Sequence, residues 1–279
     1  MFARQLNNEL WKLFGKKRTY IGFTMFLLAQ NVIAAVFKFT NASRPLRRML
    51  ETNGYPPDLF ITALTIASVM LVPIAAFLLP LYVSLVGGDL VAKEAEEGTL
   101  RMILSRPVSR ARLLMVKWAA GCLFSIVLVA ALGGLGLGFA ALYFPWGSLF
   151  VWMPEQGIFS VFGSESGLWH YTAAHVMLIT QACSIFSLAF MFSCFNVKPA
   201  AATVLALSLV FVSFILEHIP YFKEYQNWFF TYHLNLWQLM FAEKPPWWRV
   251  WQSLSLLLGF NVSFLGIGIA VFHARDIKS

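Results

Sequence analysis

Charged residues are scarce in this 279-residue sequence. Asp, Glu, Lys and Arg make up only 12% of it, about half of the roughly 25% that is usual in soluble proteins. A water-exposed surface cannot be built from so few charges, and the 59% of hydrophobic residues cluster in long uncharged runs. The composition therefore excludes soluble, disordered and disulfide-rich classes and predicts an all-α polytopic membrane protein.

Nucleotide-binding motifs are also absent from the sequence. No G-x-x-x-x-G-K-[ST] phosphate loop occurs, so the chain does not hydrolyse nucleotides by that route. Gly134, Gly136 and Gly138 lie inside an apolar run rather than between a strand and a helix, which argues against a dinucleotide site. Their spacing instead predicts close helix packing through Gly134 and Gly138.

The apolar runs lack the titratable groups that carriers and enzymes need. His175 is the only histidine well inside a run, and it is expected to be hydrogen-bonded structure. Gln181 and Asn261 either line a pathway or join helices by hydrogen bonds, and we favour the second interpretation. His170, His175 and Glu165 match no known metal-site spacing. We therefore expect no catalytic centre, no cofactor and no metal site.

Six apolar stretches are long enough to cross a bilayer, which takes about 20 residues as a helix. None of the six contains Asp, Glu, Lys or Arg, and Pro73 and Pro80 are expected to kink the second. The even number places both termini on one side. The predicted spans are Tyr20–Phe37, Leu59–Gly87, Trp118–Phe144, Tyr171–Phe195, Pro199–Leu216 and Val250–Phe272.

The distribution of basic residues predicts which side of the membrane holds the two termini. Fourteen of the 21 lysines and arginines lie in segments on the side of the termini, and such residues concentrate in the cytoplasm. We expect a multi-pass protein of the bacterial inner membrane, with 145–170 and 217–249 extracytoplasmic. The basic residues that give the net charge of +8 flank the apolar runs, so they are suited to contact lipid headgroups and not nucleic acid.

Three segments between or before the spans have a recognisable character. Residues 1–18 predict an amphipathic helix in the membrane interface, because Phe2, Leu6, Leu10, Leu13 and Phe14 recur at helical spacing. The alternative is a disordered basic tail. Residues 145–169 are expected to form a surface loop with at most one short helix. Before the sixth span, 221–248 predicts short re-entrant helices in the outer leaflet.

The segment 88–117 carries ten of the 34 formal charges and is expected to fold into short helices. Asp89 can cap the first, and Gly98 can end it because glycine takes a positive φ without a Cβ penalty. Pro107 should stop the next turn. Ser109 can cap the helix that becomes the third span.

The turn Leu100–Leu104, capped by Thr99, is the candidate docking element. Leu100, Ile103 and Leu104 are expected to form a small apolar patch framed by arginines, suited to a cytoplasmic partner. The alternative is a solvated connector whose arginines only fix topology.

At these residues the sequence resembles the ABC-2-type transporter permeases. The resemblance rests on Glu94…Glu97-Gly98-Thr99-Leu100, on Leu104 to Arg110 and on Lys117, and it extends over nearly the whole chain. It implies a permease domain of six transmembrane helices over residues 1–279, whose loop docks on a separate cytoplasmic ATP-binding-cassette ATPase. It also implies a second permease copy or a homologous permease. The implied ATPase-coupling residues are Glu94, Glu97, Gly98, Thr99, Leu100, Arg101, Leu104 and Arg106.

The leading hypothesis is therefore the permease subunit of an exporter, which is not itself an enzyme. One alternative is a non-transporting scaffold that passes ATPase-driven motion to a periplasmic partner, such as a metalloenzyme maturation system. Another is a self-contained channel or carrier, which the uncharged spans argue against. Phe-rich spans without charge favour an amphipathic or lipid-like substrate.

Overall fold

The computed structural model describes residues 2–105 and 108–275. Its helices are α1 (Phe2–Phe14), α2 (Lys17–Phe39), α3 (Arg44–Thr52), α4 (Pro57–Phe60), α5 (Ala63–Pro73), α6 (Leu79–Glu96), α7 (Thr99–Leu104), α8 (Arg110–Tyr143), α9 (Ser164–Ser193), α10 (Pro199–His218), α11 (Phe230–Leu234) and α12 (Trp247–Ala274). The shorter helical segments are η1 (Asn41–Ser43), η2 (Ile74–Leu78), η3 (Pro154–Gln156), η4 (Pro220–Trp228) and η5 (Asn235–Phe241). Strands β1 (Leu149–Met153) and β2 (Ile158–Phe162) complete the fold.

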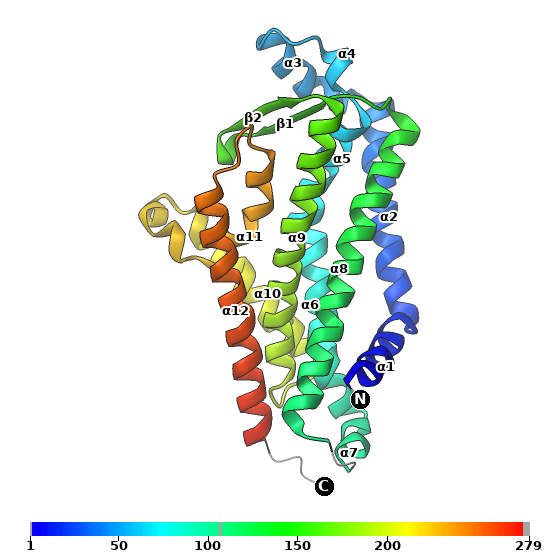
Figure 1. The fold of residues 1–279 in the computed structure, drawn as a ribbon, viewed down its shortest axis with the longest axis vertical. Helices are drawn as coiled ribbons and strands as arrows, with labels where there is room; N and C mark the ends of the chain where they lie inside the picture. The colour runs from blue at the N-terminus through cyan, green and yellow to red at the C-terminus, as the bar shows by residue number, and fades with distance from the viewer. Residues whose placement is uncertain (1, 106–107, 276–279) are drawn as a thin grey trace.

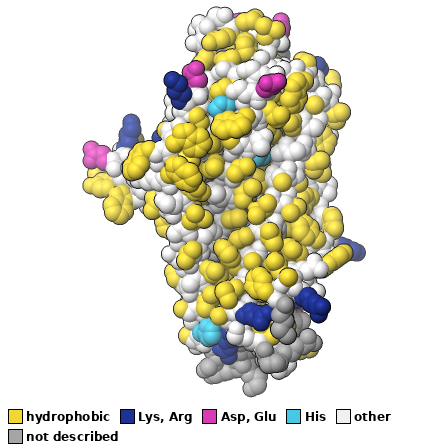
Figure 2. Space-filling view, viewed as in Figure 1, with side chains coloured by type: hydrophobic (Ala, Val, Ile, Leu, Met, Phe, Trp, Pro, Cys, Tyr) yellow, Lys and Arg dark blue, Asp and Glu magenta, His cyan; other side chains and the backbone are white. Residues whose placement is uncertain are grey.

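Six of these helical units are long and apolar enough to cross a membrane, as predicted. They are α2, the continuous α5–η2–α6 unit, α8, α9, α10 and α12. Figure 2 shows hydrophobic side chains over the middle of one face, with charged side chains towards the two ends and on a projecting segment. The protein is an all-α polytopic membrane protein.

The two ends of the bundle differ in structure (Figure 1). Helices α1 and α7 and the last turn of α12 lie at one end, here called the loop end. The β1–β2 hairpin and helices α3 and α4 lie at the other, here called the hairpin end. The start and the end of the described chain therefore share a side, as an even number of spans requires.

Helix α9 forms the centre of the bundle, where it contacts α6, α8, α10, α12 and η5. Small residues on α8 allow the close approach. A Cβ at Gly121 would collide with the Phe186 ring, and one at Gly133 would meet the His175 ring at 2.6 Å. Within the chain, the predicted packing through Gly134 and Gly138 is not formed, because no described atom lies within 4 Å of a Cβ built at either. The small residues that pack are on another face of the same helix.

Polar side chains within the spans join helices, as favoured from the sequence. Asn261 of α12 accepts a hydrogen bond from Ser187 of α9 (2.6 Å) and donates one to Ser184 (2.8 Å). Gln181 of α9 donates through Nε2 to the Ala75 carbonyl (2.9 Å). His175 is hydrogen-bonded within its own helix, to the Tyr171 carbonyl (2.9 Å).

The second span changes geometry where its prolines lie. After Pro73 the chain adopts a π-helical turn over η2 and then continues as α6 with Pro80 in the first turn. Proline removes one intrahelical hydrogen bond, and a π turn re-pairs the backbone groups around it. The predicted kink is therefore realised as a π segment.

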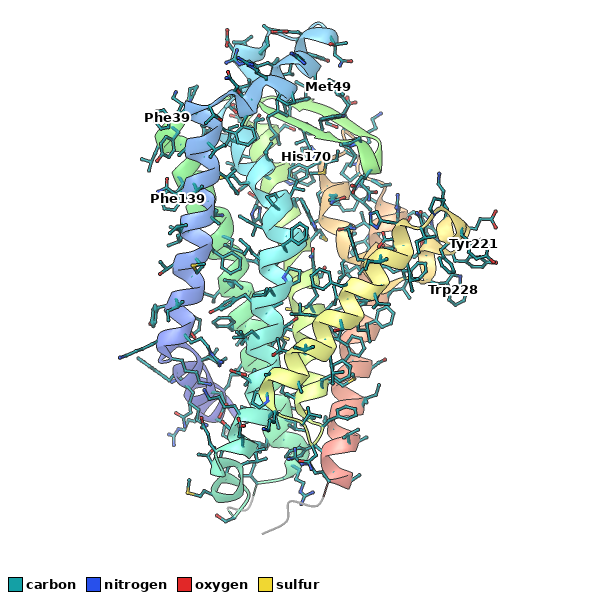
Figure 3. All side chains as sticks on the ribbon, turned by 180° about the vertical axis from the view of Figure 1, so that it is seen from behind. Phe39, Met49, Phe139, His170, Tyr221 and Trp228 are labelled. Atoms are coloured by element: carbon teal, nitrogen blue, oxygen red, sulfur yellow. The ribbon has the colours of Figure 1, made fainter. Side chains whose placement is uncertain are left out.

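The segments outside the spans hold more structure than the sequence indicated. Residues 145–163 are not a loop, because β1 and β2 pair antiparallel from Leu149–Phe162 to Met153–Ile158. The strand signal is the short apolar run Leu149–Met153, in which all five residues are hydrophobic. The expected short helices before the sixth span are present as η4, α11 and η5. Of these, α11 and η5 are buried in the bundle, while η4 projects from it with Tyr221 and Trp228 outermost (Figure 3).

Candidate ATPase-coupling loop

The helix that leads into the loop begins well before the predicted cap. Helix α6 runs without interruption to Glu96, so Asp89 lies inside it, and the predicted N-cap at Asp89 is wrong. The upstream span already supplies helical backbone there, so no new start is required. The buried Asp89 carboxylate instead pairs with Arg18 at the start of α2.

Gly98 reverses the chain between α6 and α7, as predicted. Its φ of +73° lies in the left-handed region, and its N–H donates to the Ala95 carbonyl (3.2 Å). Thr99 is already the first residue of α7, and its hydroxyl donates back to the Glu94 carbonyl (3.2 Å). Thr99 therefore closes the end of α6, so its predicted role as the cap of α7 is wrong.

The start of α8 is fixed from two directions. The Ser109 hydroxyl accepts a hydrogen bond from the Arg112 N–H (3.4 Å), which is the predicted cap. The Arg110 guanidinium donates to the His273 and Arg275 carbonyls, both at 3.1 Å. A cation suits the end of α12, because the last carbonyls of a helix lack partners.

The predicted apolar docking patch is directed inward. Leu100 is only 2% exposed and belongs to the protein's own core, and Ile103 packs against that core. Leu100 is therefore not available to a partner, because burying it completes the contact between the turn and the bundle. Met102 of α7 is 66% exposed, and Glu97 at the end of α6 is also exposed. The side chains of Arg101 and Leu104, together with Arg106 and Pro107, lie outside the described residues.

Four charged side chains form an ion cluster behind the loop. Lys117 Nζ of α8 lies 2.7 Å from Glu94 Oε1 of α6 and 2.9 Å from Glu9 Oε2 of α1. Lys12 Nζ lies 2.7 Å from Glu9 Oε1 and 3.4 Å from Glu94 Oε1. The Lys117 side chain is 1% exposed. This ion cluster (Glu9, Lys12, Glu94 and Lys117) therefore joins α1, α6 and α8 at one point.

The charges in the ion cluster stabilise one another. Burial by itself raises the pKa of the Glu9 carboxyl, but Lys117 and Lys12 outweigh it and hold that pKa below its usual value. Burial by itself lowers the pKa of the Lys12 ammonium, but Glu9 and Glu94 outweigh it and raise that pKa. Both groups are therefore held in their charged forms.

Glu94 is the only member of the ion cluster that was predicted from the sequence to be an ATPase-coupling residue. Helix α1 was predicted, and the face that packs inward is the expected apolar one, but it packs on the protein core and includes Glu9. Leu13 and Glu9 are buried, and Leu6, Leu10 and Phe14 pack on the protein core, while Trp11 is exposed. One signal was available: Glu9 is the only acidic residue among the first 18. A lone carboxylate among basic residues indicates a specific partner.

A cleft of about 260 Å³ lies between α1 and the loop. It brings polar residues of α1 opposite Ile103 of α7 and Val108, which precedes α8. Its lining residues are Gln5, Asn8, Glu9, Lys12, Ile103, Val108, Leu113 and Val116. Helix α1 therefore forms one wall of the site, although α7 and α8 follow it by about a hundred residues.

One family model matches most of the chain. The family model described as "Protein of unknown function (DUF2705)" matches residues 25–278, and the chain belongs to that family. No curated protein matches the chain.

Proposed function

We propose that this member of the DUF2705 family is the permease subunit of an ABC-2-type exporter, driven by a separate cytoplasmic ATP-binding-cassette ATPase. The proposal is supported above all by the loop between α6 and α8. There a glycine with positive φ leads into a short helix whose inner side is fixed to the bundle and whose outer side carries Met102, while the exposed Glu97 ends the preceding helix. The loop end then faces the cytoplasm of a bacterial inner membrane.

Motion imposed on this loop would be passed to three helices together. Leu100 seats α7 in the core, and Glu94 ties the end of α6 to Lys117 of α8 and, through it, to Glu9 of α1. Buried charge pairs resist separation, because an unpaired charge in a low-dielectric interior is costly. Two permease copies, or this chain with a homologous permease, would enclose the transport pathway.

A charge reversal in the loop tests the proposal directly. The purified chain is mixed with its candidate cytoplasmic ATP-binding-cassette ATPase, and the complex is compared with that of the Glu97→Lys variant. Glu97 is exposed, and its ion pair with Lys93 is long, at 3.9 Å. Exposed pairs of this kind contribute little to stability, so the substitution should not unfold the chain. We expect normal insertion but at least tenfold weaker ATPase binding, with a clear dependence on salt.

The control for this experiment is Glu51→Lys, the same reversal at an exposed residue of α3 at the hairpin end. It is expected to bind and stimulate the ATPase like the unsubstituted chain. If the chain forms no stable complex with the ATPase, or if Glu97→Lys stimulates it normally, the proposal is wrong.

The second candidate is a membrane scaffold that transmits ATPase-driven motion to a partner outside the membrane. The projecting η4 segment favours it, since Tyr221 and Trp228 are 80% and 84% exposed there and are suited to a protein or lipid contact. Accumulation of substrate in sealed vesicles separates the two functions. An exporter accumulates substrate with ATP, whereas a scaffold does not.

A further inference from the structure

Two adjoining cavities at the hairpin end form one groove. A polar part of about 580 Å³ lies between the end of α10, η4 and the start of α12. An apolar part of about 270 Å³ lies between η2, α10 and η5. Glu155 and Asn235 line both parts. The two are therefore contiguous, and we call them together the hairpin-end groove.

Buried polar atoms without a partner line both parts of the groove. Glu217 is 8% exposed, and its Oε2 accepts no hydrogen bond from the described residues. In the apolar part, Gln181 (4% exposed) and Trp237 (1% exposed) have an Oε1 and an Nε1 without a partner in the same set. Folded proteins pair nearly all buried polar groups. Of these groups, the Glu217 carboxylate in the polar part points to a ligand that donates a hydrogen bond to it.

The polar part presents charges of both signs. The Glu217 and Glu155 carboxylates line it together with Lys223 and the Arg249 guanidinium. Arg249 is held in place by Tyr232, whose hydroxyl accepts its hydrogen bond and whose ring lies 4.8 Å away. A guanidinium has five donors, so Arg249 retains donors for a phosphate. An amine and a phosphate on one head group match Glu217 and Arg249.

The apolar part is suited to a hydrocarbon chain. Small residues of η2 leave space there, and aromatic residues of α10 face them across it. Its apolar lining includes Val72, Ala75, Ala76, Phe77, Ile185, Val210, Phe211 and Phe214. The π turn of η2 widens the helix at this level, and such turns are frequent at functional sites.

We propose that the hairpin-end groove binds one aminophospholipid molecule. Its ammonium group pairs with Glu217, its phosphate with Arg249, and one acyl chain occupies the apolar part beside Gln181. This inference rests on the proposed function, for which it names the substrate class. The binding site itself needs no ATPase, and this separates the two in experiment.

Native mass spectrometry of the purified full-length chain in detergent, without ATPase, tests the site. Dioleoyl phosphatidylethanolamine is titrated against the unsubstituted chain, Glu217→Gln and Glu224→Gln. Glu224 is the matched control, because it is exposed on η4 and does not line the groove. We expect one retained lipid, at least tenfold weaker retention in Glu217→Gln, and no change in Glu224→Gln.

Further arms identify which part of the ligand is bound. Ala76→Phe fills the apolar part from an exposed position and should abolish retention without unfolding the chain. Phosphatidylglycerol, which lacks the amine, should be retained at least tenfold less. Soluble glycerophosphoethanolamine should not compete at millimolar concentration, because it lacks the tail. Equal retention of both lipids, or full retention by Glu217→Gln, would overturn the inference, whereas lipid binding without ATPase stimulation would overturn only the exporter.

Discussion

Lys117 is the most deeply buried charge in the ion cluster at the loop end. It is buried on α8, where an unpaired lysine would be strongly unfavourable, and it contacts two carboxylates within 3 Å. Removing one partner of such a cluster leaves the others buried and uncompensated. The stability of this region therefore depends on the whole set and not on one pair.

Lys117→Met tests that dependence. It should lower the free energy of unfolding by about 3–5 kcal/mol, because Glu9 and Glu94 then lose their buried cation and keep only the half-exposed Lys12 between them. Adding Glu9→Gln and Glu94→Gln should restore much of the loss. Thermal unfolding in detergent measures both. Lys93→Met is the control, because Lys93 is 40% exposed and its pair with Glu97 spans 3.9 Å, so we expect almost no change.

Gly98 allows a residue-level test that separates strain from coupling. Gly98→Val should cost about 1–3 kcal/mol, since a β-branched residue is forced to positive φ, while no atom lies within 4 Å of the added Cβ. Gly54 is the matched control, with φ of +78° and equally open space at the hairpin end. Both variants should unfold at similar temperatures, but only Gly98→Val should lose ATPase stimulation.

Gly98→Asn completes the comparison, because asparagine tolerates the left-handed region better than other side chains. It should recover most of the stimulation. Equal loss in Gly54→Val and Gly98→Val would show that the effect is general destabilisation and not a property of the loop.

At the scale of the elements, the contact between α8 and α9 depends on which glycine faces which ring. Gly121→Ala should destabilise the bundle by about 1–3 kcal/mol, because the added Cβ collides with the fully buried Phe186 ring. Gly134→Ala on the same helix should leave the unfolding temperature unchanged or raise it slightly, since it meets no neighbour and alanine favours helix. A lower unfolding temperature in Gly134→Ala would contradict this packing.

These two glycines also show where sequence reasoning reaches its limit. All six spans, the reversal at Gly98 and the cap at Ser109 follow from local composition and were predicted. Spacing alone, however, cannot identify the face of α8 that meets α9. The same limit explains Leu100: its apolar character was evident, but whether it packs inward or on a partner depends on tertiary contacts. The ion cluster joins residues about a hundred positions apart, which no local pattern reveals.

At the scale of the whole molecule, α6 and η2 connect the two ends. Ala75 lines the hairpin-end groove, and Glu94 belongs to the ion cluster on the same continuous helical unit. Nineteen residues of helix separate them, or about 28 Å at 1.5 Å per residue. A displacement of the loop along this axis therefore reaches the π turn beside the groove.

A displacement can pass from a cytoplasmic ATPase to the hairpin-end groove only if the two ends face opposite sides of the membrane, with the loop end in the cytoplasm. Single cysteines at Glu97 and at Glu224 test it in intact cells with a membrane-impermeant maleimide. Both positions are exposed, one beside α7 and one on η4. We expect Glu224→Cys to react from outside and Glu97→Cys to react only after permeabilisation. The unsubstituted chain is the control, because Cys122 and Cys183 are partly buried and Cys194 is fully buried within the helices. Reaction of Glu97→Cys in intact cells would show that the loop end faces the outside of the cell. A cytoplasmic ATPase could then not reach the loop.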